Sequence, residues 1–446
     1  MSGRPKVTRR VGLAVGALVA LVAATRGAPG QELKITLRET TLASVPAPSL
    51  QKPWATSPDL RRLAWARSQA GQWQVMLDNR AQATVSDVLD LKFSPDSRRL
   101  AIHAVRGDRA VAILDGADVQ SFDEILRGSL TFSPDSARIA FFARRVASWF
   151  LLIDGTQRDL GRATRPQRLL FSPDGKRLAA IVSRGGTWSI LLDETARDYE
   201  GLAPQSVIFT PDGKSVAAVV TRHSAQIGLE QIVLIDDKPQ KSHGAIAVGP
   251  IAFSADGKRW ACAIKRRGAA GIEHAVVVDD AVGKAYDAEG IDRLTFSPDS
   301  SKLAYVVRRL DDQVVVLDGE EQVRAQQIAS PLAFSADAQR LAYVATVPAR
   351  GSSTPDAVLM VNGQEKARFR HICAPVFSLD GKRLAFGAQQ ADGRCVLVVD
   401  DAQTRCRSLL PDSMIALPSG GFRAIAQSPP TDSVRELLRV DIAVGE

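Results

Sequence analysis

The sequence has few of the residues from which catalytic and metal sites are usually built. It contains four cysteines and five histidines among 446 residues. No Gly-x-Ser-x-Gly elbow is present, which excludes the hydrolase domains that carry this motif. The histidines are scattered, and none forms a His-x-x-x-His pair or another spacing typical of zinc ligands. The sequence therefore predicts no catalytic residue, no metal ligand and no cofactor.

A long apolar run is also missing. The run over residues 11–24 has fourteen residues, whereas a membrane-spanning helix needs about 20. A basic segment precedes this run and small residues end it, an order typical of a signal peptide. We expect a signal peptide over residues 1–24, cleavage after Ala24, and a periplasmic or secreted mature chain without a transmembrane span. The general secretory route, the twin-arginine route and an uncleaved anchor remain open.

The chain lacks a strong net charge of either sign. The formal charge is +8, and the predicted signal peptide carries four basic residues and no acids, so the mature chain has 8 − 4 = +4. Such a small charge on more than 400 residues gives no reason to expect nucleic-acid binding. Four cysteines in an exported chain permit disulfides but are too few for a disulfide framework.

What the chain does have is one motif in ten copies. Residues 171–180 read Phe-Ser-Pro-Asp-Gly-Lys-Arg-Leu-Ala-Ala. Two copies that match this motif only in part begin at Thr56 and Ala416. The nine steps between these last two cover 360 residues, a mean period of 40 residues. The motif phenylalanine recurs in eight copies, at Phe93, Phe132, Phe171, Phe209, Phe253, Phe296, Phe334 and Phe377.

Each repeat has the pattern of a four-stranded antiparallel unit. Ser-Pro-Asp-Gly forms a tight turn between the first two strands, and this use of the aspartate is favoured over calcium binding. The third strand ends in a hairpin signal such as Asp-Gly or Asn-Gly. Four strands per 40 residues are typical of a β-propeller blade. One position is always alanine, which predicts a crowded contact between blades, at Ala64, Ala101, Ala140, Ala179, Ala217, Ala261, Ala304, Ala342, Ala385 and Ala424.

The last repeat lacks a fourth strand. Residues 25–55 hold one alternating segment, residues 33–38, followed by a proline-containing stretch that we expect to be an entry loop. We predict that the alternating segment supplies the missing strand and closes the repeats, which span residues 56–446, into one ring. The fold class is therefore all-β, a propeller of about ten four-stranded blades. Two five-bladed rings remain the alternative.

The repeated turn, followed by Lys or Arg, an apolar residue and Ala, resembles the TolB-type, WD-repeat-like β-propeller family over roughly residues 56–430. The resemblance implies either a periplasmic accessory protein that binds partner proteins or a propeller attached to a peptidase. Ten copies exceed the usual blade number of the family. Because the sequence contains no catalytic motif, we expect an exported, non-catalytic scaffold that binds a protein or an anionic envelope component. The alternative is a propeller lyase or hydrolase of an anionic polysaccharide, since propeller lyases gather histidines from separate blades around a metal.

The candidate binding residues are cations that follow the second strand of each repeat. Their loops vary in length, whereas the turns at the other end are uniform, and binding sites favour variable loops. We predict that they attract an anionic partner; the alternative is that they pair with nearby acids. The residues are Arg106, Arg144, Arg145, Arg184, Arg222, Lys265, Arg266, Arg267, Arg308, Arg309 and Arg350.

Two cysteines lie symmetrically about a predicted hairpin turn. Cys395 and Cys406 flank the turn at Asp400 and Asp401, because 395 + 406 equals 400 + 401. They should face each other across two strands as a hydrogen-bonded pair, the less favourable register for a disulfide. We nevertheless predict a Cys395–Cys406 disulfide, and we expect Cys262 to be a free thiol in the core.

Overall fold

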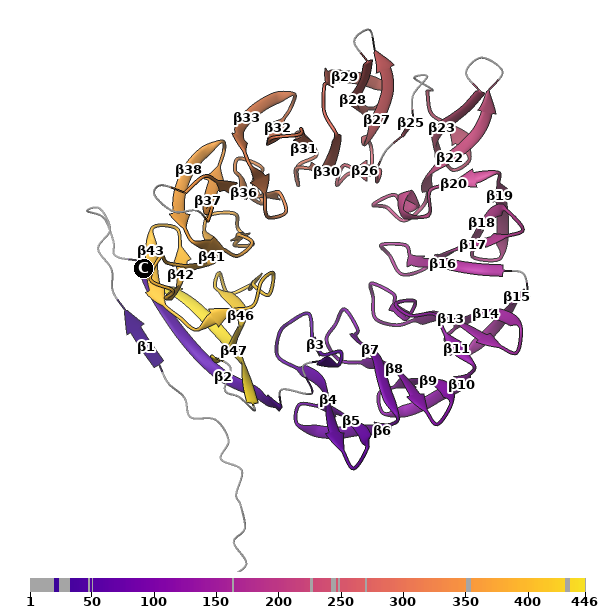
Figure 1. The fold of residues 1–446 in the computed structure, drawn as a ribbon, viewed down its shortest axis with the longest axis horizontal. Coiled ribbons are helices and arrows are strands. Elements are labelled where there is room, and N and C mark those ends of the chain that lie inside the picture. Colours follow the sequence, from indigo (N-terminus) through magenta and orange to yellow (C-terminus); the bar gives the residue numbers. More distant parts are fainter. Residues whose placement is uncertain are drawn as a thin grey trace, which may run out of the picture.

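The chain forms a single ring of ten antiparallel β-sheets around one axis (Figure 1). The predicted ring of four-stranded blades is confirmed, and the alternative of two five-bladed rings is wrong. Among the described residues, no helix is long and apolar enough to cross a membrane. The computed structural model describes residues 20–23, 33–46, 49, 51–162, 164–224, 228–241, 246–247, 249–268, 271–349, 354–429 and 434–445.

The first five blades run in chain order, and each contains four strand positions. Blades 1 and 2 consist of β3 (Ala55–Thr56), β4 (Leu63–Gln69), β5 (Gln72–Leu77), β6 (Arg80–Val85), and of β7 (Asp87–Phe93), β8 (Leu100–Arg106), β9 (Arg109–Leu114), β10 (Ala117–Phe122). Blades 3 and 4 consist of β11 (Glu124–Ile125), β12 (Thr131–Phe132), β13 (Ile139–Arg145), β14 (Ser148–Ile153), β15 (Thr156–Gly161), and of β16 (Thr164–Phe171), β17 (Leu178–Arg184), β18 (Thr187–Leu192), β19 (Thr195–Tyr199). Blade 5 consists of β20 (Gly201–Leu202), the 3-10 helix η2 (Pro204–Ser206), β21 (Ile208–Phe209), β22 (Val216–Ser224), β23 (Gly228–Ile235) and β24 (Lys238–Pro239).

The remaining blades repeat this order, and the last one also takes strands from the N-terminal region. Blades 6 and 7 consist of β25 (Ile246–Ala247), β26 (Ala252–Phe253), β27 (Trp260–Gly268), β28 (Gly271–Val278), β29 (Ala281–Tyr286), and of β30 (Gly290–Phe296), β31 (Leu303–Arg308), β32 (Gln313–Leu317), β33 (Glu320–Ala325). Blades 8 and 9 consist of β34 (Gln327–Ile328), β35 (Ala333–Phe334), β36 (Leu341–Val347), β37 (Asp356–Val361), β38 (Gln364–Phe369), and of β39 (His371–Ile372), β40 (Val376–Phe377), β41 (Leu384–Gln389), β42 (Cys395–Val399), β43 (Ala402–Arg405). Blade 10 consists of β44 (Ser408–Leu409), β45 (Ile415–Ala416), β46 (Phe422–Gln427), β47 (Val434–Gly445), β2 (Lys34–Pro46) and β1 (Ala20–Ala23).

The repeated motif folds as a turn whose polar groups form hydrogen bonds within the turn itself. In blade 4 the buried Ser172 hydroxyl donates to Asp174 Oδ1 at 2.6 Å and accepts from Arg177 N at 2.9 Å. Asp174 Oδ1 also accepts from Lys176 N at 3.2 Å. The serine hydrogen bond is the main reason that the pKa of Asp174 lies below its usual value. This carboxylate is therefore used by its own turn, and the same holds at Asp96, Asp135, Asp212, Asp256, Asp299, Asp337 and Asp380.

The arginine of the motif fastens each blade to the next one. Arg177 Nε lies 3.1 Å from Asp193 Oδ2 in the hairpin turn of its own blade, and Nη1 donates to the carbonyl of Lys214 in the next blade. Its guanidinium group lies 5.8 Å from the centre of the Phe209 ring, also in the next blade. The same contact, between a motif arginine and the motif phenylalanine of the next blade, recurs for Arg62, Arg99, Arg138, Arg259 and Arg340. The cations of the turn region therefore have a structural role.

Among the described residues, ten buried apolar clusters hold the ring together, one between each pair of neighbouring blades. Between blades 4 and 5, for example, Ala179 and Ile181 pack with Val207, Phe209 and Val220. The recurring alanines lie in these clusters and are at most 1% exposed. The predicted crowding is confirmed, because each alanine lies where two sheets meet and leaves little room for a larger side chain.

The N-terminal strand closes the ring, as predicted, but it is longer than expected. β2 pairs antiparallel with β47 from Lys34 opposite Gly445 to Pro46 opposite Val434, and it lies on the outer side of β47 in Figure 1. Residues 39–46, which we expected to belong to the entry loop, therefore continue the strand. This stretch contains β-branched residues that favour strands, and a register shift near Leu42 preserves the pairing. β1, which lies within the predicted signal peptide, pairs with the outer side of β2.

One buried histidine should make folding stability depend on pH. His103 on β8 is 2% exposed, and its Nδ1 finds no partner among the described residues. Burial lowers the pKa of His103 to about 4. The charge of Asp90 raises this pKa and the charge of Arg127 lowers it, and both effects are smaller than that of burial. The unfolded chain binds a proton near pH 6.5, so the unfolded state holds more protons below that pH. We expect the free energy of unfolding to fall between about pH 6.5 and pH 4, by up to about 3 kcal/mol.

Denaturant titrations across this pH range measure the effect. His103→Gln should reduce the slope, of which the buried His274 supplies a part because burial lowers its pKa too, whereas the matched change His223→Gln at an exposed site should leave the slope intact. Equal slopes in the two variants would contradict the assignment to His103. The turn aspartates act at lower pH, because their depressed pKa values, about 2 for Asp299, confine their contribution to the region below about pH 4.

Candidate binding face

Strand pairing sorts the connections onto two faces of the ring. In blade 2, Phe93 lies opposite Leu100 beside the Ser-Pro-Asp turn, and Arg106 lies opposite Arg109 at the other end of the strand. The third strand then returns to the first end, where its last residue, Leu114, lies opposite Ala117. We call the end with both tight turns the turn face. The loop face is the opposite end, with the hairpins between second and third strands and the links between blades.

The predicted cations lie on the loop face, and most of them already have a carboxylate partner. Arg222 Nε lies 2.6 Å from Glu230 Oε1, and this glutamate side chain is buried. Arg309 lies within 3.4 Å of both Asp312 and Glu321. Other ion pairs join Arg106 to Asp118, Arg144 to Glu124, Arg266 to Glu273 and Arg308 to Asp292. The charge of this group of cations is therefore largely balanced within the blades.

The remaining cations differ in their surroundings. Arg145 lies 5.2 Å from the centre of the Phe122 ring. Arg184 donates to the Leu160 carbonyl and to Thr164 Oγ1. Lys265 and Arg267 form no ion pair with a described residue. Arg350 lies outside the described residues. Four of the predicted cations, Arg145, Arg184, Lys265 and Arg267, thus lack a carboxylate partner in the part of the chain that the structure describes.

Exposed apolar side chains stand beside these cations, and the sequence analysis did not find them. They occupy the hairpins between second and third strands, and each is between 58% and 83% exposed. The sequence did contain a signal for these residues, because two of them directly follow an arginine pair and the other two directly follow the hairpin turn. They belong to blade 3 and to the consecutive blades 5, 6 and 7, at Val146, Leu229, Ile272 and Leu310.

One of these apolar residues is held in a strained conformation. Val146 has φ +57°, which is unfavourable for a β-branched residue. Its N–H donates to Asp123, and its carbonyl accepts from Arg144 Nη1 at 3.1 Å. The neighbouring side chains thus impose the backbone that exposes the valine.

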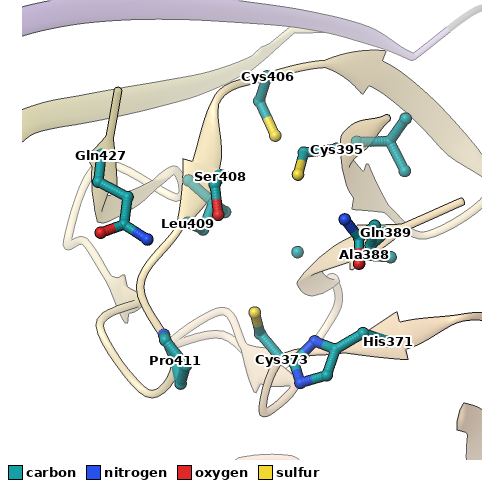
Figure 2. A pocket seen from close by; sticks show the side chains of 12 residues that line it. His371, Cys373, Ala388, Gln389, Cys395, Cys406, Ser408, Leu409, Pro411 and Gln427 are labelled. Atoms are coloured by element: carbon teal, nitrogen blue, oxygen red, sulfur yellow. The ribbon is translucent and has the colours of Figure 1, made fainter. Parts of the chain in front are cut away.

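A cavity of about 250 Å³ opens between blades 9 and 10. Three of the four cysteines line it: Cys373 after β39, Cys395 at the start of β42, and Cys406 after β43. Gly387 on β41 leaves the space, because a Cβ there would lie 2.8 Å from Leu409 Cδ1. Figure 2 shows the Cys395 and Cys406 sulfurs side by side at one wall of the cavity, with Cys373 and His371 on the opposite wall.

All four cysteines are free thiols in this structure, and the Cys395–Cys406 disulfide stays a prediction. The predicted register is present: Val396 lies opposite Arg405, and Cys406 N donates to Cys395 O at 3.1 Å. Opposite residues of a hydrogen-bonded pair have Cα atoms about 5.5 Å apart and Cβ atoms up to about 5.5 Å apart, wider than the Cβ separation of about 3.8 Å that suits a disulfide. Cys262 is buried in blade 6, as expected.

The described histidines do not assemble into one site. His103, His223, His274 and His371 belong to blades 2, 5, 6 and 9, and His243 lies outside the described residues. Among the described residues, no group of three or more His, Cys, Asp or Glu is arranged to hold a metal ion.

Comparisons with known proteins find structural similarity only. No family model matches the sequence, and no curated protein matches it. Dipeptidyl peptidase 4 from Porphyromonas gingivalis is similar over 66% of this chain, with 11% identity and a TM-score of 0.42, and this chain spans 57% of its length. TolB from Acinetobacter baumannii is similar over 59% of this chain and 62% of its own, with 18% identity and a TM-score of 0.23.

An oligogalacturonate lyase from Vibrio parahaemolyticus is similar over 70% of this chain and 96% of its own, with 12% identity and a TM-score of 0.30. TolB is thus among the similar solved structures. With TM-scores below 0.5, these similarities support no statement about binding or catalysis.

Proposed function

We propose that this chain is an exported, non-catalytic scaffold whose loop face binds a protein with acidic and apolar side chains. The observation that carries the proposal is the row of exposed apolar side chains beside arginines on blades 3, 5, 6 and 7. On the turn face the motif arginines are engaged between blades, and Leu379 in the motif turn of blade 9 is exposed. Protein interfaces are enriched in arginine and have an apolar centre, and exposed apolar clusters mark such interfaces.

The charges of the loop face favour a role in steering. Exposed ion pairs contribute roughly 0–1 kcal/mol each, so the arginines of such pairs can exchange partners at little cost in stability. Arg222 is different, because its partner Glu230 is buried. Lys265 and Arg267 add positive charge beside Ile272. Several cations on one surface raise the rate at which an acidic partner associates. The apolar side chains favour a protein over a polysaccharide, because sugar chains offer few apolar groups to cover them.

A pull-down from the periplasm tests the proposal. A tagged chain should be recovered in the periplasmic extract together with one protein, and the purified pair should bind directly. The triple variant Leu229→Ser, Ile272→Ser, Leu310→Ser should bind at least about tenfold more weakly, because the apolar contacts are lost. Its stability should be unchanged, since all three side chains are exposed.

The contribution of charge is tested on the same pair. Lys265→Glu with Arg267→Glu should slow association, and the difference from wild type should shrink as salt rises, because the Debye length falls from about 10 Å at 0.1 M to about 3 Å at 1 M. The matched control reverses Lys176 and Lys258 on the turn face, where both side chains are 82% exposed. Equal losses from both pairs of reversals would contradict a binding site on the loop face. Depolymerisation of an anionic polysaccharide, or binding only to anionic vesicles, would likewise overturn the proposal.

A further inference from the structure

The strand register of Cys395 and Cys406, which are opposite residues of a hydrogen-bonded pair, suits a linear metal bridge better than a disulfide. Two bonds of roughly 2.3 Å, the usual length for a metal–thiolate bond, place two sulfur atoms about 4.6 Å apart when the ion lies between them. Directly opposite residues of a strand pair have Cβ atoms about 4.5–5.5 Å apart. The two side chains project from the same wall into the cavity with their sulfurs side by side, so the sulfur separation follows this strand spacing. Bridging by a two-coordinate ion therefore needs less movement than formation of an S–S bond.

We propose that Cys395 and Cys406 form a two-coordinate site for a soft monovalent ion, Cu(I). The ligand count selects this class of metal. Structural zinc takes four ligands, and among the described residues no three metal-binding side chains are arranged around one point. Two thiolates are sufficient for a soft d¹⁰ cation, and thiolate ligands select Cu(I) over harder ions. This site is separate from the apolar hairpins of blades 3, 5, 6 and 7 and does not depend on the proposed partner.

The Cys406 thiol is buried beside other titratable groups. Burial and the neighbouring thiols raise the pKa of Cys406 to about 12, and Glu39 on β2 acts in the same direction. The other titratable groups near the cavity are Cys373, Asp412 and His371. Binding of one Cu(I) by two thiols forms two Cu–S bonds and releases two protons. The cavity between the blades lets the ion enter without unfolding of either sheet.

Titration of the reduced chain with Cu(I), in competition with a coloured Cu(I) chelator and without oxygen, tests the site. We expect one Cu(I) per chain and an ultraviolet thiolate-to-copper absorption band. Cys395→Ser and Cys406→Ser should each lower the affinity at least about 100-fold, because a single thiol cannot form the bridge. Cys262→Ser is the matched control in blade 6 and should bind like wild type. Cys373→Ser should retain one Cu(I) per chain.

A second measurement does not depend on variants. Alkylation of the folded wild-type chain, followed by peptide mass mapping, should show Cys395 and Cys406 protected when one equivalent of Cu(I) is present and Cys373 still reactive. Absence of Cu(I) binding, equal affinity in Cys406→Ser, or tight thiol-dependent binding of Zn²⁺ would each overturn the assignment. A Cys395–Cys406 disulfide in the chain isolated from its native compartment would also overturn it.

Discussion

A chain that begins at residue 47 should lose more than about 4 kcal/mol of unfolding free energy and should self-associate. It lacks β2, which is paired with β47 along its whole length. Ile35, Leu37 and Val45 of β2 are at most 3% exposed, and they belong to the clusters that join blade 10 to blades 9 and 1. Removal of the strand uncovers these clusters and leaves β47 as a free sheet edge. Denaturant unfolding and size-exclusion chromatography measure the two effects.

The control is a chain that begins at residue 33. It lacks β1 but keeps β2, so it should match a chain that begins at residue 25 in both stability and oligomeric state. This comparison separates the closing strand from the segment before it. If the chain from residue 47 stayed monomeric with unchanged unfolding free energy, closure by β2 would not contribute to stability.

Arg423→Ala should destabilise the ring by about 3 kcal/mol. Arg423 is the one residue before a repeated alanine that is not apolar, and its side chain is 8% exposed. Its Nε donates to Asp441, and its Nη1 donates to the Asp59 carbonyl of blade 1 at 2.7 Å. Removal of the guanidinium group breaks the contact across the seam and leaves Asp441 with Arg439 as its remaining partner.

Arg98→Ala provides the comparison for this prediction. The Arg98 side chain is 86% exposed and lies 4.0 Å from Asp96, so its loss should leave the unfolding free energy unchanged within error. Both variants are measured by denaturant unfolding at the same pH. A similar small effect in the two variants would show that the Arg423 contact does not hold the seam.

The blades themselves follow from local chemistry, and the sequence was sufficient to predict them. A serine and an aspartate two residues apart satisfy the turn from within, as Ser172 and Asp174 do. The adjoining strands are nearly continuous apolar runs because both faces of each sheet are covered. Ten copies without a linker then leave one ring, and the missing strand of the last copy identifies the N-terminal segment that closes it.

Contacts between distant residues were decided by the tertiary structure. Arg423 contacts Asp59, 364 residues away in sequence, and no local pattern indicates this contact. The charge of the loop face depends on partners across neighbouring strands, such as Asp292 for Arg308. The cavity needs Gly387 together with cysteines from three segments of blade 9. Turns and strands are determined by neighbours in sequence, whereas pairing of charges, seams and cavities depends on which side chains the closed ring brings together.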